Sequence, residues 1–263
     1  MIKLIITDMD GTLLDDQHNI HPEFWEVEKK LRDKGIMFSV ASGRQYYNLV
    51  SNFEQLKGHM MFFAENGSYV VHQDKELYTN TMDREQANEF IKLGREAENC
   101  NLVLCGVNSA YAESDDEEFI TEVGKYYKRL EVVDDLTKVD DKVLKVTLCN
   151  FEGVEENTFP KFEKFQDDFK VAIASRIFID IMSNTANKGN AIKGVQKELN
   201  ISPEETMVFG DYLNDLEMMQ NAKYSYAMKN AHPEIIKVSN YVTKYDNNEN
   251  GVVRTIKEMG LID

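Results

Sequence analysis

Near its N-terminus the chain reads KLIITDMDGTLL (residues 3–14), an apolar run that ends in two aspartates and a glycine. Residues 3–7 predict a short buried strand, because most of them are aliphatic or β-branched. Asp8, Asp10 and Gly11 then form a turn at the carboxyl end of that strand. In an open α/β sheet, ligands bind outside the carboxyl ends of the strands. The segment therefore predicts an α/β fold with a functional site after the first strand.

The same order of strand, loop and helix repeats along the chain. Apolar residues at helical spacing predict a helix over residues 22–34, followed by a strand over 36–40, a helix ending near 56 and a strand over 60–64. The pattern resumes with a helix over 188–199, a strand over 206–209, a helix ending near 222, a strand over 224–228 and a helix near 252–259. Such alternation favours a parallel sheet covered by helices.

The middle of the chain has a different pattern. It predicts helices over 85–98, 117–130 and 155–165, and strands over 102–107, 110–113, 143–150, 171–175 and 177–182. Strands separated by so few residues favour antiparallel pairing. We therefore expect a discontinuous core domain (1–82 and 185–263) interrupted by an inserted α+β domain (83–184).

The composition argues against several classes of protein. Thirty Lys and Arg residues against 46 Asp and Glu residues give a net charge of −16, which disfavours nonspecific binding to nucleic acid or to anionic membranes. No apolar run reaches the roughly 18 to 20 residues that a bilayer span requires. The three cysteines lack CxxC spacing, which argues against a disulfide framework or a structural zinc site. A cytoplasmic location is expected.

Asp8 and Asp10 are the strongest chemical signal. Two carboxylates two residues apart allow one to attack as a nucleophile while the other transfers protons. A calcium loop starting at Asp8 would need glycine at its sixth position and glutamate at its twelfth, where this chain has Leu13 and Asn19. A solvated turn with two incidental aspartates is the other interpretation of this segment taken alone.

A second polar cluster, GDYLND (residues 210–215), follows the predicted strand over 206–209. Together with Asp8, the carboxylates of Asp211 and Asp215 and the amide of Asn214 offer the hard oxygen ligands that Mg²⁺ prefers. One of these aspartates is also a candidate N-cap for the next helix.

Two further elements stand at predicted junctions between a loop and a helix. Ser42 and Gly43 follow the second strand, and Lys188 stands at the start of the helix over 188–199. Free backbone N–H groups and the helix dipole favour phosphate at such places, and a lysine adds a point charge. A turn serine or a surface lysine is common in any protein, so these residues carry weight only in combination.

Two other phosphate chemistries are excluded. The chain contains no GxxxxGK[ST] loop of the P-loop type. A cysteine-nucleophile phosphatase needs arginine six residues after its cysteine, and those positions hold Gly106, Tyr111 and Glu155.

In their order along the chain, these elements closely resemble the four motifs of the haloacid dehalogenase superfamily of phosphohydrolases, and the chain resembles the Cof-type branch. The resemblance rests on DMDGTLL (8–14), ASGR (41–44), AENGS (64–68), NKGNA (187–191), GDYLND (210–215) and AMKNAHPEI (227–235). It implies a Rossmann-like core with a parallel sheet and an inserted α+β cap of type II, which matches residues 83–184. Met9 and Lys229 depart from the residues that are usual in the family, leucine and glycine.

The resemblance also implies roles for individual residues. Asp8 would form an aspartyl phosphate, and Asp10 would act as general acid and base. The remaining implied roles are magnesium binding by Asp8, the backbone carbonyl of Asp10 and Asp211, with Asp215 and Asn214 at or beside the metal, and phosphate binding by Ser42, Gly43, Lys188 and Asn214.

The expected function is that of a Mg²⁺-dependent phosphatase acting on small phosphorylated metabolites, sugar phosphates above all. A phosphomutase on the same fold is one alternative. A non-enzymatic regulator is another, disfavoured because both Asp8 and Asp10 are present. The insert is expected to act as a mobile lid that selects the leaving group, in a monomer or weak homo-oligomer that binds neither nucleic acid nor membrane.

Overall fold

The computed structural model describes residues 1–262, and the chain divides into two compact units. One unit comprises Met1–Thr79 and the segment that begins at Asn187, and the other is Asn80–Ala186. The insert expected over residues 83–184 lies within the second unit. Among the described residues, no helix is both long and apolar enough to cross a membrane.

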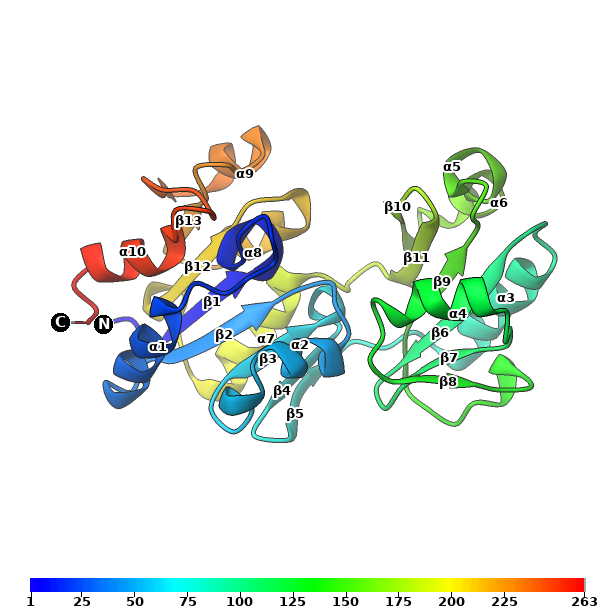
Figure 1. Ribbon diagram of the computed structural model, residues 1–263, viewed down its shortest axis with the longest axis horizontal. Helices are drawn as coiled ribbons and strands as arrows, with labels where there is room; N and C mark the ends of the chain where they lie inside the picture. Colours follow the sequence, from blue (N-terminus) through cyan, green and yellow to red (C-terminus); the bar gives the residue numbers. More distant parts are fainter. Residues whose placement is uncertain (263) are drawn as a thin grey trace. The chain divides into compact units, whose positions relative to one another are not determined.

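The first unit is built on one sheet, whose strands are β1 (Leu4–Asp8), β2 (Met37–Ala41), β3 (Met61–Ala64), β4 (Tyr69–His72), β5 (Lys75–Thr79), β12 (Thr206–Gly210), β13 (Tyr224–Ala227) and β14 (Tyr241–Val242). Their order across the sheet is β14-β13-β12-β1-β2-β3-β4-β5, and Figure 1 labels the strands from β13 to β5. Pairing is parallel from β14 to β3. The alternating pattern predicts this for β13 to β3, whereas the short edge strand β14 is not predicted. The hairpin β4–β5 is antiparallel and adds an edge that the pattern does not predict.

Helices cover both faces of this sheet. They are α1 (Glu23–Asp33), α2 (Tyr46–Asn52), α7 (Lys188–Leu199), α8 (Leu216–Met219), α9 (Pro233–Val238) and α10 (Gly251–Glu258). α1 packs with α10, and α7 packs with α8. The connections β1–α1–β2 and β12–α8–β13 proceed in opposite directions across the sheet, so right-handed crossovers place α1 and α8 on opposite faces. Leu4, Ile5 and Ile6 of β1 are consequently buried on both sides.

The second unit has its own sheet and core. Its strands are β6 (Asn101–Gly106), β7 (Ala110–Ala112), β8 (Leu130–Val132), β9 (Val143–Cys149), β10 (Phe169–Ser175) and β11 (Phe178–Ser183), in the order β10-β11-β9-β6-β7-β8. Its helices are α3 (Arg84–Arg95), α4 (Glu117–Gly124), α5 (Val154–Asn157) and α6 (Phe159–Phe162). β6 and β7 pair antiparallel, as their spacing predicts. Phe90 of α3 and Phe162 of α6 share one apolar core with Val146 of β9.

Two expected helices of the second unit are shorter than predicted. The helix expected over 117–130 ends at Gly124, and Leu130–Val132 instead forms the edge strand β8. The helix expected over 155–165 is broken at Thr158 into α5 and α6. Pro160 accounts for the break, because a proline lacks the N–H that a continuous helix would use and its ring collides with the preceding turn.

Short irregular elements complete the chain. Met9–Leu13 is an irregular helical turn, and 3-10 turns lie at Glu54–Leu56, Glu65–Gly67, Leu136–Lys138, Glu163–Phe165, Pro203–Glu205 and Leu213–Asp215. Several of these turns stand directly after a strand of the first unit, where they carry the polar residues described next.

Candidate active site

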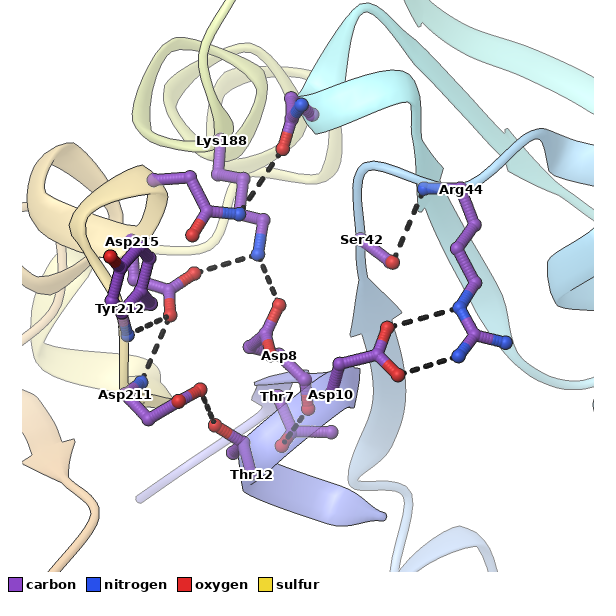
Figure 2. A network of polar contacts seen from close by, with 12 residues as sticks. Thr7, Asp8, Asp10, Thr12, Ser42, Arg44, Lys188, Asp211, Tyr212 and Asp215 are labelled. Carbon is purple, nitrogen blue, oxygen red and sulfur yellow. Dashed lines mark hydrogen bonds and ion pairs between the residues drawn. The ribbon is translucent and has the colours of Figure 1, made fainter. Parts of the chain in front are cut away.

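The candidate residues gather at one end of the first sheet. β12, β1, β2 and β3 are neighbours and run parallel, so their carboxyl ends meet at one edge. Asp8 is the last residue of β1, Ser42 follows β2, and Asp211 follows β12. Lys188 is the first residue of α7 and reaches the same place (Figure 2). All of these residues belong to the first unit.

Lys188 is the centre of the polar network. Its side chain is fully buried, and its Nζ atom donates hydrogen bonds to Asp8 Oδ1 and, at 2.6 Å, to Asp215 Oδ1 (Figure 2). Burial alone lowers the pKa of a lysine, but the charges of Asp215 and Asp8 outweigh it and raise the pKa of Lys188 above its ordinary value. The ammonium group is therefore charged at any physiological pH.

Asp215 joins Lys188 to the loop after β12. Its Oδ1 atom accepts from Lys188, and its Oδ2 atom accepts from the backbone N–H groups of Asp211 at 3.0 Å and Tyr212 at 3.3 Å. Gly210 makes this possible, because a Cβ atom there would lie 2.6 Å from Asp215 Oδ2. Both carboxylate oxygens of Asp215 thus hold other parts of the site in place.

Asp8, Asp211 and Asp215 form an acidic cluster in which one oxygen from each carboxylate lies within 4.8 Å of the others. Burial, reinforced by the charges of Asp215 and Asp211, raises the pKa of Asp8 well above its ordinary value despite the opposing charge of Lys188. Burial also raises the pKa of Asp211 to about 6, against the hydrogen bond from Thr12. Closely spaced, dehydrated carboxylates repel one another, and hard oxygen donors of this kind suit Mg²⁺. The residues present therefore fit a divalent cation.

Asp10 does not belong to this acidic cluster. Its side chain turns toward Arg44, whose guanidinium donates from Nε to Oδ2 at 3.0 Å and from Nη2 to Oδ1 at 2.5 Å (Figure 2). His18 Nδ1 lies 3.3 Å from Asp10 Oδ1. A metal contact through the backbone carbonyl of Asp10 stays a prediction.

Three of the four residues expected to bind phosphate, Ser42, Gly43 and Asn214, meet at Asn66. The backbone N–H of Asn66 donates to the Ser42 carbonyl at 2.9 Å, and its Oδ1 atom accepts from Asn214 Nδ2 at 3.2 Å. A Cβ atom at Gly43 would lie 3.1 Å from the Asn66 side chain. Asn66 has a positive φ of 54°, a conformation that asparagine adopts more readily than most residues. Asn66 therefore connects the loop after β2 to the loop after β12.

Sequence reasoning assigned no role to Asn66, Arg44, Thr12 or Asn230. The hydroxyl of Thr12 donates to Asp211 Oδ1 at 2.7 Å, and the Asn230 side chain donates to the Gly11 carbonyl at 2.8 Å. The Glu65-Asn66-Gly67 turn did carry a signal, because it follows an apolar strand just as the turn at Asp8 does. The other contacts depend on how distant loops approach one another.

Gly67 brings the turn after β3 close to the start of α7. It has a φ of +87°, and a Cβ atom there would lie 2.8 Å from the Asn187 carbonyl oxygen and 3.0 Å from Lys188 Cα. Asn187 in turn caps α7, because its side chain accepts from the backbone N–H of Asn190 at 2.7 Å. These two contacts fix the start of α7 and so direct Lys188 toward Asp8.

Comparison with known proteins identifies a protein family and phosphatase relatives of this chain. Residues 5–256 match the family model described as haloacid dehalogenase-like hydrolase. The chain is 32% identical over 265 residues to the 5-amino-6-(5-phospho-D-ribitylamino)uracil phosphatase YbjI of Escherichia coli, covering 98% of this chain and 96% of that protein. It is 24% identical to the phosphatase YwpJ of Bacillus subtilis, over 98% of this chain and 100% of that one.

A solved structure is similar to this chain over nearly its whole length. The structure of TM0651 from Thermotoga maritima is similar with a TM-score of 0.88 at 26% identity, covering 98% of this chain and 97% of that chain. At this coverage the match spans both units of the fold. The chain therefore belongs to the haloacid dehalogenase-like hydrolase family and is a phosphatase of that family.

Proposed function

We propose that this protein is a Mg²⁺-dependent phosphatase that hydrolyses small phosphate monoesters through an aspartyl-phosphate intermediate on Asp8. The observation that carries the proposal is the contact of Asp8 with the buried, charged Lys188 at the carboxyl end of β1. An ammonium group in this position stabilises the carboxylate form of Asp8 and favours the approach of a phosphoryl group.

In the first step Asp8 attacks phosphorus, and the bond from phosphorus to the leaving oxygen breaks. Asp10 gives its proton to that oxygen, so the leaving group departs as an alcohol. In the second step Asp10 removes a proton from water while the water oxygen attacks phosphorus. The bond to Asp8 then breaks, and inorganic phosphate is released.

The positive charge of Lys188 offsets the negative charge of the phosphoryl oxygens in both steps. Ser42 and the backbone at Gly43 supply further donors, and Asn214 is held in place by its hydrogen bond to Asn66. Mg²⁺ would be held by Asp8 and Asp211, with Asp215 beside them in the acidic cluster. When bound, the ion supplies charge neutralisation where the carboxylates and the phosphoryl group meet.

A phosphorylated sugar or polyol is the proposed substrate class. The name of the Escherichia coli relative specifies a phosphatase for a compound that carries a phosphorylated ribityl chain. Its identity of 32% over nearly the whole chain supports a related phosphate ester here. We assign the second unit, Asn80–Ala186, the role of a cap that recognises the leaving group.

The test is a phosphate-release screen of the purified protein with Mg²⁺. Hexose, pentose, polyol, nucleotide, flavin and pyridoxal phosphates form the panel, and the Asp8→Asn variant is the matched control at each substrate. Release of phosphate by the unmodified protein alone, with a preference for sugar or polyol phosphates, is the expected result. Formation of an isomeric sugar phosphate without phosphate release would instead indicate a mutase.

A further inference from the structure

Arg44 and Asp10 form a two-point contact at the edge of the site. Nε of Arg44 donates to one carboxylate oxygen of Asp10 and Nη2 donates to the other, at 3.0 and 2.5 Å (Figure 2). The planar guanidinium therefore fixes both the position and the plane of the carboxylate. A lysine, which carries a single point charge, would leave that plane free to rotate.

This ion pair is poorly placed to stabilise the fold. The side chain of Asp10 is 44% exposed and that of Arg44 is 28% exposed, and pairs with this much contact with water contribute little to the free energy of unfolding. Its main physical consequence is the orientation of Asp10.

Arg44 is itself held by the loops that build the site. Its backbone N–H donates to Ser42 Oγ at 3.3 Å, and its carbonyl accepts from the backbone N–H of Glu65 at 3.0 Å. The guanidinium thus extends from the loop after β2, anchored beside the turn after β3, to the loop after β1. The orientation of Asp10 therefore depends on the relative positions of three strand ends.

We propose that Arg44 is a positioning residue for proton transfer by Asp10. The proposal rests on the acid–base role given to Asp10 in the proposed function. The two-point contact fixes the plane of the Asp10 carboxyl group, and so the direction in which that group gives its proton to the leaving oxygen. After transfer the proton resides on the departing alcohol, and Asp10 is again a carboxylate bound at both oxygens.

The experiment compares Arg44→Ala, Arg44→Lys, Asp10→Asn and the double variant in single-turnover assays. Two substrates are used: a sugar phosphate preferred by the unmodified protein, and p-nitrophenyl phosphate, whose leaving group departs without a proton. Arg44→Ala is expected to slow the first step on the sugar phosphate about 100-fold, the scale of a misplaced catalytic group. The loss on p-nitrophenyl phosphate should be at least about 10-fold smaller. Arg44→Lys should recover part of the lost rate.

The double variant separates positioning from direct binding. If Arg44 acts through Asp10, Arg44→Ala should slow the Asp10→Asn protein by less than about 2-fold, because the group that it orients is already disabled. Multiplicative losses, or a weaker inhibition by inorganic phosphate in Arg44→Ala, would assign Arg44 to the phosphoryl group and overturn the proposal. An equal loss on both substrates would overturn it as well.

Arg95→Ala is the matched control. Arg95 makes a similar two-point contact with Glu113, but in the second unit rather than in the unit that carries the acidic cluster. Removing the Arg95 side chain should leave the ratio of the rates on the sugar phosphate and on p-nitrophenyl phosphate unchanged. Circular dichroism should show that every variant folds. An unmodified protein that releases no phosphate from any substrate contradicts the proposed function, whereas an active protein with multiplicative losses contradicts the role of Arg44 alone.

Discussion

Lys188 Nζ lies 2.6 Å from Asp215 Oδ1 and also donates to Asp8, so a single buried ammonium joins two carboxylates that would otherwise repel. The second oxygen of Asp215 accepts from the backbone after β12. The ion pair thus connects three segments of the first unit: the end of β1, the start of α7 and the loop that carries Asp211. Charge balance and the geometry of the site depend on the same side chains.

Replacing Lys188 by methionine should therefore impair stability and activity together. The change leaves two buried carboxylates without their shared cation, and removing one partner of a buried ion pair typically costs about 3 to 5 kcal/mol of the free energy of unfolding. Phosphate release should fall below detection. Denaturant unfolding followed by the fluorescence of Trp25 in α1 measures the first effect. Lys237→Met, at an exposed lysine, is the control, and equal stability of the two variants would contradict the prediction.

Asp8→Asn should fold and lose turnover by several orders of magnitude. An amide is a poor nucleophile toward phosphorus and a weaker metal ligand than a carboxylate. Rapid acid quench followed by intact mass measurement should detect a phosphorylated species in the unmodified protein and none in the variant. Activity above a few per cent of the unmodified level would remove Asp8 from the role of nucleophile.

Metal dependence provides a separate prediction for the acidic cluster. Activity should require Mg²⁺, and Ca²⁺ should bind and inhibit, because calcium accepts bidentate carboxylates and would occupy both oxygens of Asp8. Both ions should raise the melting temperature of the metal-free protein, since each reduces the repulsion among Asp8, Asp211 and Asp215. Asp211→Asn should weaken both shifts. Full activity in excess chelator would contradict the prediction.

The strand ends that carry the site could be predicted because their polar residues follow apolar runs directly in the sequence. Asp8 follows β1 and Asp211 follows β12, and parallel pairing brings these ends together. Side-chain contacts between loops could not be predicted in this way. The contacts of Arg44 with Asp10 and of Asn66 with Asn214 depend on the final positions of loops that are far apart in sequence.

The hairpin β4–β5 shows a different limit of sequence reasoning. Its turn residues Gln73 and Asp74 both have positive φ, 53° and 58°. Asn-Gly or Asp-Gly is the usual signal for such a turn, and the chain lacks it here. The pairing of β4 with β3 and with β5 evidently stabilises a turn that these two residues do not favour locally.

His72 on β4 should make stability depend on pH. Burial lowers its pKa below the ordinary 6.5, against a hydrogen bond with the His59 carbonyl that raises it. Between the lowered pKa of the folded state and 6.5, the unfolded chain binds the proton more readily. The contribution of His72 to the free energy of unfolding is therefore complete above pH 6.5. It decreases as the pH falls from 6.5 to the lowered pKa of the folded state.

The measurement for His72 is chemical unfolding of the unmodified protein and of His72→Gln at several pH values from 8 to 5. Glutamine does not titrate, so the difference in unfolding free energy between the two proteins should shift in favour of the variant as the pH falls. A difference that stays constant over this range would show that His72 has the same proton affinity in both states.

The second unit contains its own buried ion pair, and we expect this pair to stabilise that unit. Lys145 Nζ on β9 donates to Asp180 Oδ2 on β11 at 2.9 Å, and the Thr147 hydroxyl donates to Asp180 Oδ1 at 2.6 Å. All three side chains are buried. Asp180→Ala leaves a buried ammonium without this partner and should destabilise the second unit by about 3 to 5 kcal/mol.

The two units can be observed separately in the same protein. Trp25, the only tryptophan of the chain, lies in the first unit, so its fluorescence reports that unit, whereas far-ultraviolet circular dichroism reports both. Asp180→Ala should lower the midpoint of the unfolding transition followed by dichroism and leave the midpoint followed by fluorescence unchanged.

The double variant Lys145→Met/Asp180→Leu should recover much of the lost stability, because apolar residues of similar size need no partner. Lys138→Met breaks an exposed pair with Asp135 and should change stability by less than about 1 kcal/mol. If Asp180→Ala shifted both transitions equally, the two units would unfold as one, and the assignment of this ion pair to the second unit's own stability would be wrong.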